Sequence, residues 1–133
     1  MIILSCKAYD LDAAIAAIRP AVDARTAILP VLNGLSHLAA LDAAFGPGRV
    51  LGGLAKIQAS LGPDDAVRQF NDWRWITFGE RDGTMSERVR AIEAAFAPTK
   101  GVVATAVPDV MMRMWEKIVH LCTAAIGTVL MRA

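Results

Sequence analysis

The sequence has little cysteine, and neither cysteine has a partner at a recognisable spacing. Cys6 and Cys122 each lie inside an apolar run, and the chain has no CxxC motif and no Cys/His set spaced as metal ligands. Isolated apolar cysteines are typical of reduced, intracellular proteins. We therefore expect both side chains in the core of a cytoplasmic protein, with no disulfide and no metal site.

An excess of charge of one sign is also lacking. The chain carries 14 Lys and Arg residues against 13 Asp and Glu residues, which gives a formal net charge of +1. Because the two signs are interspersed along the chain, no stretch attracts a polyanion. The sequence predicts that nucleic acid is not a partner.

No run is long enough to predict a membrane span. Residues 1–6 are apolar but few, lack a basic leader and are followed at once by Lys7, which argues against a signal peptide. The apolar tract 118–131 is interrupted by His120 and is shorter than the roughly 20 residues that cross a bilayer. We expect no membrane partner and interpret this tract as a buried helix.

Apolar residues, in contrast, are abundant. They make up 55% of the 133 residues, while charged residues make up 20%. A chain of this size and composition can form one compact domain with its own core and is too apolar to remain disordered. It also carries more apolar surface than one such domain usually covers by itself. We therefore expect a homo-oligomer or a complementing chain.

Two strand–turn–helix units open the sequence. Residues 2–6 form an apolar run with β-branched side chains, and an Ala-rich helical segment follows at 11–18. A second apolar run at 26–32 is followed by an Asn-Gly turn signal and by a helical segment at 35–45. Successive strand–helix units favour a parallel sheet that is covered by helices.

The rhythm then changes. Short polar breaks separate the next candidate strands, a helix capped by Ser86 follows, and one more apolar strand precedes the last helix. These strands are expected at 50–61, 66–70, 73–78 and 101–107. From Pro108 onward, apolar residues recur at helical spacing to the end of the chain. The predicted fold class is α/β, with a parallel sheet, an antiparallel edge and a long C-terminal helix.

Polar residues at the strand ends mark a candidate site. Ligands of open parallel sheets bind at the carboxyl ends of the strands, where Lys7 and Asn33 follow the first two predicted strands. On the last helix, Arg113, Lys117 and His120 are three or four residues apart and share a face. We expect the two loops to line one crevice and this basic face to point into it.

Five short segments, taken in order, resemble landmarks of the ketopantoate reductase family. They are Lys7-Ala8-Tyr9-Asp10, Asn33-Gly34, Leu51-Gly52-Gly53, Phe78-Gly79-Glu80 and Met114-Trp115-Glu116-Lys117. Their order and spacing carry the resemblance, which spans nearly the whole chain. It implies that residues 1–107 are a partial Rossmann-like nicotinamide-binding domain and that residues 108–133 are the first helix of a truncated all-helical domain.

Enzymes of this family reduce the ketone of 2-dehydropantoate with NADPH, a step toward pantothenate. The resemblance implies that Lys117 is the catalytic lysine, which polarises the ketone and donates a proton to it. It also implies that Asn33 binds both cofactor and substrate, that Lys7 lies beside the cofactor, and that Gln58 contacts the cofactor through its backbone. A partly desolvated ammonium suits this chemistry, because it stabilises alkoxide charge and its lowered pKa makes it a stronger general acid.

The chain departs from the family's pattern at three points. The family begins with a strand, a GxGxxG loop and a helix that hold the pyrophosphate, and this sequence contains no such loop. The substrate-binding asparagines one and two turns after the lysine correspond here to Leu121 and Ala125. A later serine and glutamate of the family would lie beyond Ala133. We expect an isolated chain that is incomplete or inactive, and the natural 2-keto acid stays open.

Each candidate residue also has an ordinary structural interpretation. Lys117 fits a solvated lysine on an amphipathic helix, and Asn33 fits a turn that tolerates positive φ. The charges around Lys117 fit a salt-bridge network on the helix surface. We interpret the three tryptophans as packing anchors: Trp73, Trp75 and Trp115.

Two other functions stay open. The chain can be a non-catalytic domain that oligomerises through its last helix, since that helix carries a wide apolar surface. It can also be one segment of a split enzyme whose partner chain supplies the glycine-rich half. Binding of NADPH by the chain alone, by the chain with a partner, or by neither distinguishes these functions.

Overall fold

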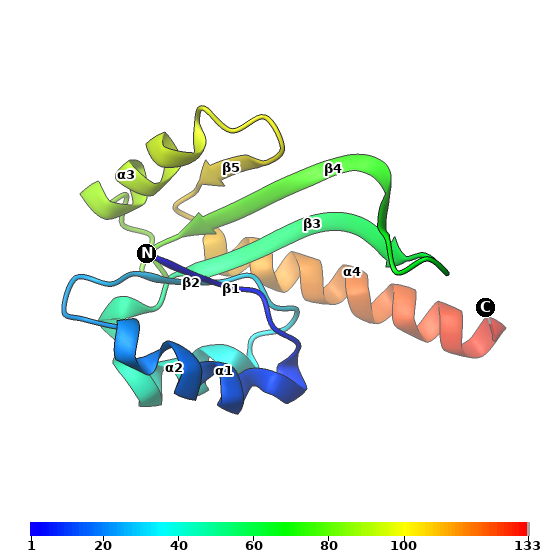
Figure 1. Ribbon diagram of the computed structural model, residues 1–133, viewed down its shortest axis with the longest axis horizontal. Helices are drawn as coiled ribbons and strands as arrows, with labels where there is room; N and C mark the ends of the chain where they lie inside the picture. Colours follow the sequence, from blue (N-terminus) through cyan, green and yellow to red (C-terminus); the bar gives the residue numbers. More distant parts are fainter. Residues whose placement is uncertain (133) are drawn as a thin grey trace.

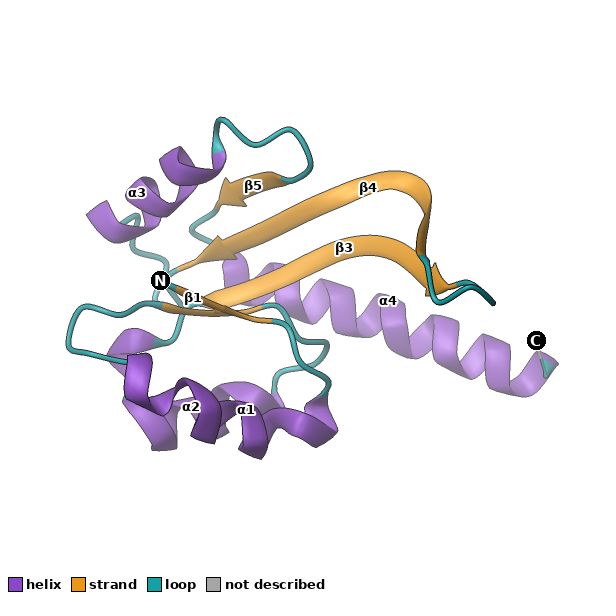
Figure 2. Cartoon of the chain, in the orientation of Figure 1, coloured by secondary structure: helices purple, strands orange, loops and turns teal. Residues whose placement is uncertain are grey.

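A computed structural model describes residues 1–132 of the chain; Ala133, the last position of the predicted segment 108–133, lies outside the described residues. The fold is mixed α/β, with two small sheets flanked by helices and a long C-terminal helix (Figure 1). Figure 2 shows a long strand hairpin and this last helix extending in the same direction from the body of the molecule. The predicted fold class is confirmed.

The first sheet comes from the two strand–helix units. Strands β1 (Ile2–Leu4) and β2 (Ile28–Pro30) pair in parallel, with Ile3 opposite Leu29. Helix α1 (Leu11–Ile18) follows β1, and helix α2 (Ser36–Phe45) follows β2. Both helices lie on the same side of this sheet (Figure 1), where their apolar residues join those of the strands in one core cluster. Both predicted units are therefore confirmed, with shorter strands than expected.

The second sheet contains the long hairpin. Strands β3 (Gly52–Leu61) and β4 (Val67–Gly79) are antiparallel, and β5 (Val103–Ala106) pairs in parallel with the other edge of β4. The two strands predicted at 66–70 and 73–78 are one strand. Their polar break coincides with an irregularity, at which the pairing passes from Ile57–Arg74 to Ala59–Gln69. A bulge of this kind changes the register without ending the strand.

Helix α3 (Glu87–Phe96) begins at the predicted cap. The Ser86 hydroxyl accepts a hydrogen bond from the Val89 amide at 3.3 Å and donates one to Glu80 at 2.6 Å. The Arg88 guanidinium holds the pKa of the Glu80 carboxyl below its usual range. These contacts fix α3 beside the end of β4, so that its apolar face closes a second core cluster around the buried Phe78.

Glycines let the two sheets and the last helix approach closely. A Cβ added at Gly53 would lie 2.5 Å from both the Pro30 oxygen and Leu29 Cδ1, and one added at Gly52 would lie 2.7 Å from Val110 Cγ1. Next to them, the Leu51 amide donates to the Ile28 oxygen at 2.9 Å. The start of β3 is therefore held against both β2 and the last helix.

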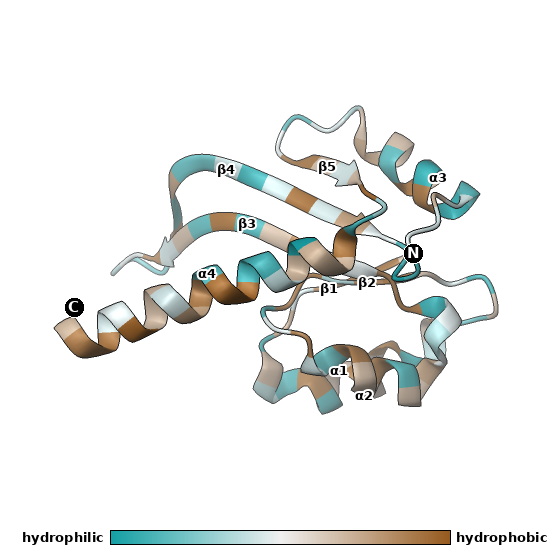
Figure 3. Cartoon of the chain, turned by 180° about the vertical axis from the view of Figure 1, so that it is seen from behind, coloured by the Kyte–Doolittle hydropathy of each residue, from teal (hydrophilic) through white to brown (hydrophobic). Residues whose placement is uncertain are grey.

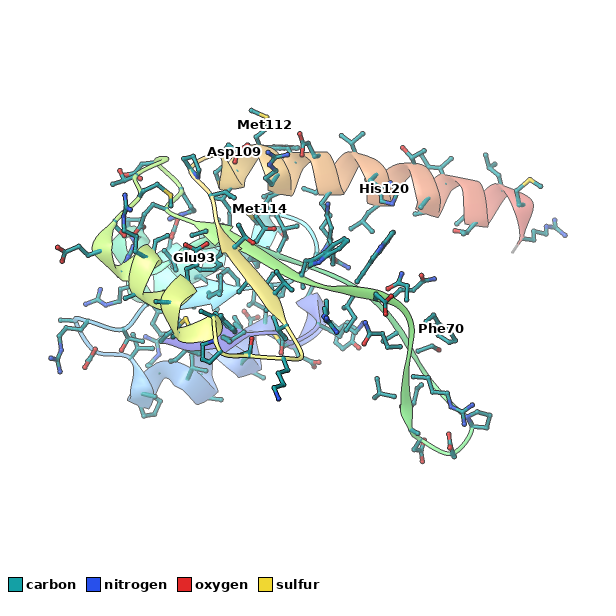
Figure 4. All side chains as sticks on the ribbon, turned by 90° about the horizontal axis from the view of Figure 1, so that it is seen from above. Phe70, Glu93, Asp109, Met112, Met114 and His120 are labelled. Carbon is teal, nitrogen blue, oxygen red and sulfur yellow. The ribbon has the colours of Figure 1, made fainter. Side chains whose placement is uncertain are left out.

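The last helix, α4 (Val110–Met131), is packed at its beginning and exposed at its end. Val110 and Met114 are buried, and Figure 4 shows Met114 pointing toward the sheet and Met112 away from it. Residues 122–132 are all exposed. The predictions that 118–131 is a buried helix and that Cys122 is a core residue are therefore wrong. Helical spacing defines an apolar face, but no element among residues 1–132 reaches far enough to cover it.

Helix α4 is also the one helix in residues 1–132 with the length and composition to cross a membrane. Length and composition alone do not distinguish a membrane span from a helix that packs against another part of a protein. Arg113, Glu116 and Lys117 lie in its first half, and that half packs against β3. The described fold therefore does not indicate a membrane protein.

Candidate functional site

A groove with a volume of about 1110 Å³ lies between the two sheets and α4. Its walls are the loops that follow β1 and β2, one face of the β3–β4 hairpin, and the first half of α4. Lys7, Asn33, Arg113, Lys117 and His120 all line it. The predicted crevice and the basic helix face that points into it are therefore both present.

Lys117 joins three separate elements within this groove. Its ammonium nitrogen, Nζ, donates hydrogen bonds to Asn33 Oδ1 and to the Ala55 carbonyl oxygen, each at 2.7 Å. The helix α4, the turn after β2 and the strand β3 thus meet at a single charged group. An ammonium has three N–H donors, so these two acceptors leave one donor for a ligand in the groove.

Local sequence explains how Lys117 reaches this position. Val110, Met114 and Lys117 follow one another at spacings of four and three residues, so they lie on one face of α4. The first two are buried in the core, and Gly52 lets the helix lie directly on β3 at this point. Lys117, on the next turn of α4, therefore lies further along β3, next to Ala55.

Burial and a neighbouring charge change the acidity of this lysine. Partial burial of the ammonium lowers the pKa of Lys117 from its ordinary value, and the positive charge of Lys56 lowers it further. Lys56 follows Ala55 on β3 and lines the same groove. Both effects disfavour the charged form, which makes Lys117 a stronger acid than a solvated lysine.

We expect a Lys56→Gln substitution to raise the pKa of Lys117, because it removes the like charge while keeping a polar side chain. The proton of Lys117 is then lost at a higher pH than in the unchanged protein. Carbon-13 NMR of the lysine ε carbons, followed as a function of pH, measures this directly. Lys100→Gln is the matched control, because Lys100 is exposed and does not line the groove. An unchanged Lys117 titration in Lys56→Gln would contradict the proposed coupling.

The other predicted residues are distributed differently. Lys7 lines the groove, in the loop after β1. Gln58 is not among the groove-lining residues, and its Oε1 accepts a hydrogen bond from Asn71 Nδ2 at 2.9 Å. Its neighbours Ile57 and Ala59 do line the groove, and the predicted backbone contact of Gln58 with the cofactor stays a prediction.

A surface ion-pair network surrounds the start of α4. Arg113 Nε lies 3.1 Å from Asp109 Oδ2, and Arg113 NH1 lies 3.4 Å from Glu116 Oε2. The salt-bridge interpretation of Arg113 is therefore confirmed. His120 lies on the side of α4 that faces the hairpin (Figure 4) and lines the groove.

Sequence reasoning missed part of the groove wall. Trp73 and Trp75 are not core residues but line the groove, with their rings stacked at 6.1 Å between centroids. Trp115 does not line it, and its exposed position on α4 makes the predicted packing role wrong within residues 1–132. The Ala55 carbonyl leaves no mark in a sequence, whereas the alternation of Trp73 and Trp75 places both rings on one face of a strand without saying what covers that face.

Comparison with known proteins gives a consistent result. The family model described as ketopantoate reductase PanE/ApbA matches residues 1–83. The uncharacterized oxidoreductase YkpB of Bacillus subtilis is 32% identical over 125 residues, which are 94% of this chain and 41% of that protein. The chain thus spans less than half the length of this curated relative.

Solved structures show the same fold. The 2-dehydropantoate 2-reductase of Geobacter metallireducens superposes with a TM-score of 0.74 at 29% identity, over 86% of this chain and 38% of that one. The 2-dehydropantoate 2-reductase of Porphyromonas gingivalis superposes with a TM-score of 0.85 at 22% identity, over 99% of this chain and 46% of that one. In both cases the match covers most of this chain and a minor part of the other.

Proposed function

Because this chain belongs to the ketopantoate reductase family, we propose that it supplies the lysine side of a site that reduces a 2-keto acid, such as 2-dehydropantoate, to the 2-hydroxy acid with NADPH. The observation that carries the proposal is the Lys117 ammonium, held at 2.7 Å by both Asn33 and the Ala55 carbonyl inside the groove. Geometry of this kind fixes a proton donor in place before a ligand arrives.

Lys117 is the proposed proton donor. The third N–H of the ammonium donates a hydrogen bond to the ketone oxygen. The positive charge then stabilises that oxygen, which becomes negative as the carbonyl carbon is reduced. The proton then passes from Nζ to that oxygen and leaves a neutral amine. The lowered pKa of Lys117 favours this transfer, since a general acid works best when its pKa lies close to the working pH.

Asn33 is the proposed positioning and binding residue. Its Oδ1 accepts from Lys117, which leaves the Nδ2 amide group as a donor toward the groove. The same side chain can therefore orient the lysine and bind a carbonyl oxygen of substrate or cofactor. Lys7, which lines the groove, is the proposed cation beside the cofactor, and Gln58, between the groove-lining residues Ile57 and Ala59, is the proposed backbone contact to the cofactor.

The groove residues fit one end of a nicotinamide dinucleotide better than the other. Amide and ammonium donors line the same groove as half-exposed indole rings, which suits a nicotinamide ring and its carboxamide. When bound, the reduced nicotinamide supplies the hydride. The sequence has no GxGxxG loop, so these 133 residues do not contain the usual cradle for the pyrophosphate. The proposed site is therefore incomplete in the isolated chain.

We further propose that residues 1–107 are the nicotinamide-binding part and that residues 108–133 begin a helical domain. The exposed apolar surface of α4 supports a homo-oligomer or a complementing chain as its cover (Figure 3). Its exposed large apolar residues are Met112, Trp115, Val119, Ile126, Val129, Leu130 and Met131. The free cysteines Cys6 and Cys122 are compatible with the proposed cytoplasmic location.

The same surface supports an alternative function. If α4 serves mainly to assemble chains, the protein is a non-catalytic oligomerising domain; if a second chain brings the glycine-rich half, the protein is one segment of a split enzyme. Both alternatives use the exposed end of α4. They differ from the first proposal in what the chain binds by itself.

Titration of the purified chain with NADPH, followed by nicotinamide fluorescence, separates these functions. We expect weak, saturable binding that Asn33→Ala reduces and that Ser60→Ala, an exposed control on the hairpin outside the groove, leaves unchanged. Binding that requires a second polypeptide would support the split enzyme. Absence of binding under both conditions would support the assembly domain and overturn the reductase proposal.

A further inference from the structure

One face of the β3–β4 hairpin presents aromatic and cationic side chains side by side. Lys56 and Trp75 are directly opposite each other in the antiparallel pair, so their side chains lie on the same face. Trp73, two residues away on β4, shares this face and stacks on Trp75 with an angle of 26° between the rings. All three side chains line the groove that contains Lys117.

The indoles are only partly covered by the rest of the chain. Trp73 is 47% exposed and Trp75 is 42% exposed. Large aromatic side chains that are half-covered inside a concave site can still bury considerable area against a ligand. The two rings therefore form an apolar wall that a ligand of matching shape can cover.

Helix α4 provides the opposite wall. Leu121 follows Lys117 by four residues, so it lies one turn further along the same helix face, and it also lines the groove. Ile57 on β3 also lines the groove, so both β3 and α4 contribute apolar residues to it. A hydroxyl group bound at this place would lose water without gaining a partner from Leu121 or Ile57.

The charges that line the groove favour an anion. Lys56 and Lys117 both line it, and within residues 1–132 neither forms an ion pair with a carboxylate. The acidic residue of the lining, Glu116, is paired with Arg113. Uncompensated positive charge next to an aromatic wall is complementary to a carboxylate that carries an aromatic ring.

We propose that the groove selects a 2-keto acid with an aromatic side chain, for which phenylpyruvate is the probe, over a small or hydroxylated one. The ring stacks on Trp75 and Trp73 and contacts Leu121, while Lys56 and Lys117 face the carboxylate and the ketone. This inference rests on the proposed 2-keto acid site and specifies its substrate class. Trp75 and Leu121 are then its specificity-determining residues.

Fluorine NMR of the chain labelled with 5-fluorotryptophan provides a test that does not depend on catalysis. Phenylpyruvate, pyruvate and 2-dehydropantoate are titrated separately, with NADP⁺ absent and present, and the resonances are assigned with single Trp→Phe variants. We expect phenylpyruvate to bind about tenfold more tightly than the other two acids. It should shift the resonances of Trp73 and Trp75 and leave that of Trp115, which lies outside the groove, unchanged.

Substitutions on both the hairpin and α4 test the proposal, so the result does not depend on one position at which a substitution could disturb folding. Trp75→Ala should raise the Kd of phenylpyruvate about tenfold with little effect on pyruvate, while Trp75→Phe retains most of the preference. Leu121→Asn, on the helix, should weaken phenylpyruvate binding without disturbing the hairpin. Trp115→Ala is the matched control and should change neither Kd.

The outcomes distinguish a failure of the aromatic preference from a failure of the proposed 2-keto acid site. If 2-dehydropantoate binds as tightly as phenylpyruvate, or if Trp75→Ala weakens all three acids equally, the aromatic preference is overturned and the 2-keto acid site survives. If none of the three acids binds, with or without NADP⁺, the proposed function fails and the inference fails with it.

Discussion

Replacing Lys117 with Met should lower kcat for 2-keto acid reduction by about 10³-fold in the protein that carries this chain. Methionine fills a similar volume but has no positive charge to stabilise the developing alkoxide and no proton to donate to the alkoxide oxygen. General acid catalysis and electrostatic stabilisation of an oxyanion each contribute about 10²-fold or more. The measurement is the steady-state rate of NADPH oxidation with a 2-keto acid at saturating concentration.

Two comparisons make this result specific to the site. Lys100→Met removes a charge from an exposed residue outside the groove and should leave kcat unchanged. NADPH affinity should change little in Lys117→Met, since the lysine acts on the ketone. A variant that keeps at least a tenth of the original kcat would show that Lys117 is not the proton donor.

A second large effect is expected from a substitution at Gly53, where β3 lies close to β2. Gly53→Ala should reduce the free energy of unfolding by about 2–3 kcal/mol, because the added methyl group collides with a backbone oxygen that cannot rotate away. That atom is the Pro30 oxygen, 2.5 Å from the position of the new Cβ. Thermal unfolding followed by circular dichroism should show a midpoint lowered by roughly 5–10 °C.

The same substitution should also loosen the site. Pro30 and Gly53 precede Asn33 and Ala55, the two acceptors of Lys117, by three and two residues. Moving β3 away from β2 therefore separates the two acceptors. Gly101→Ala is the control, since nothing lies within 4 Å of a Cβ added there. Equal unfolding midpoints for the two variants would contradict the close contact between β2 and β3.

The order of the elements was predictable because each has a local signal. Apolar runs of β-branched residues, the Asn33-Gly34 turn and the Ser86 cap are features of short stretches, and the corresponding strands and helices form where they were expected. Boundaries were less accurate. The strands β1 and β2 end before their apolar runs do, and the hairpin strand β4 continues through a polar break, because pairing partners decide where a strand ends.

Part of the site was predictable in the same way. Lys7 and Asn33 follow strands of a parallel pair, and Lys117 lies on the basic face of the last helix, so the sequence predicted both the crevice and its positive charge. The contact of Lys117 with the Ala55 carbonyl was not, because a backbone oxygen is present at every residue. The groove position of Trp73 and Trp75 was also missed, since alternation on a strand does not say which face is covered.

The sequence by itself determined the α/β class, the order of strands and helices, and the family to which the chain belongs, because these depend on local periodicity and on landmarks in order. The tertiary structure alone decided which apolar surfaces are covered. It buried Val110 and Met114, left the end of α4 and Cys122 exposed, and turned two tryptophans toward the groove. Burial depends on what lies opposite a face, and that partner is distant in the sequence.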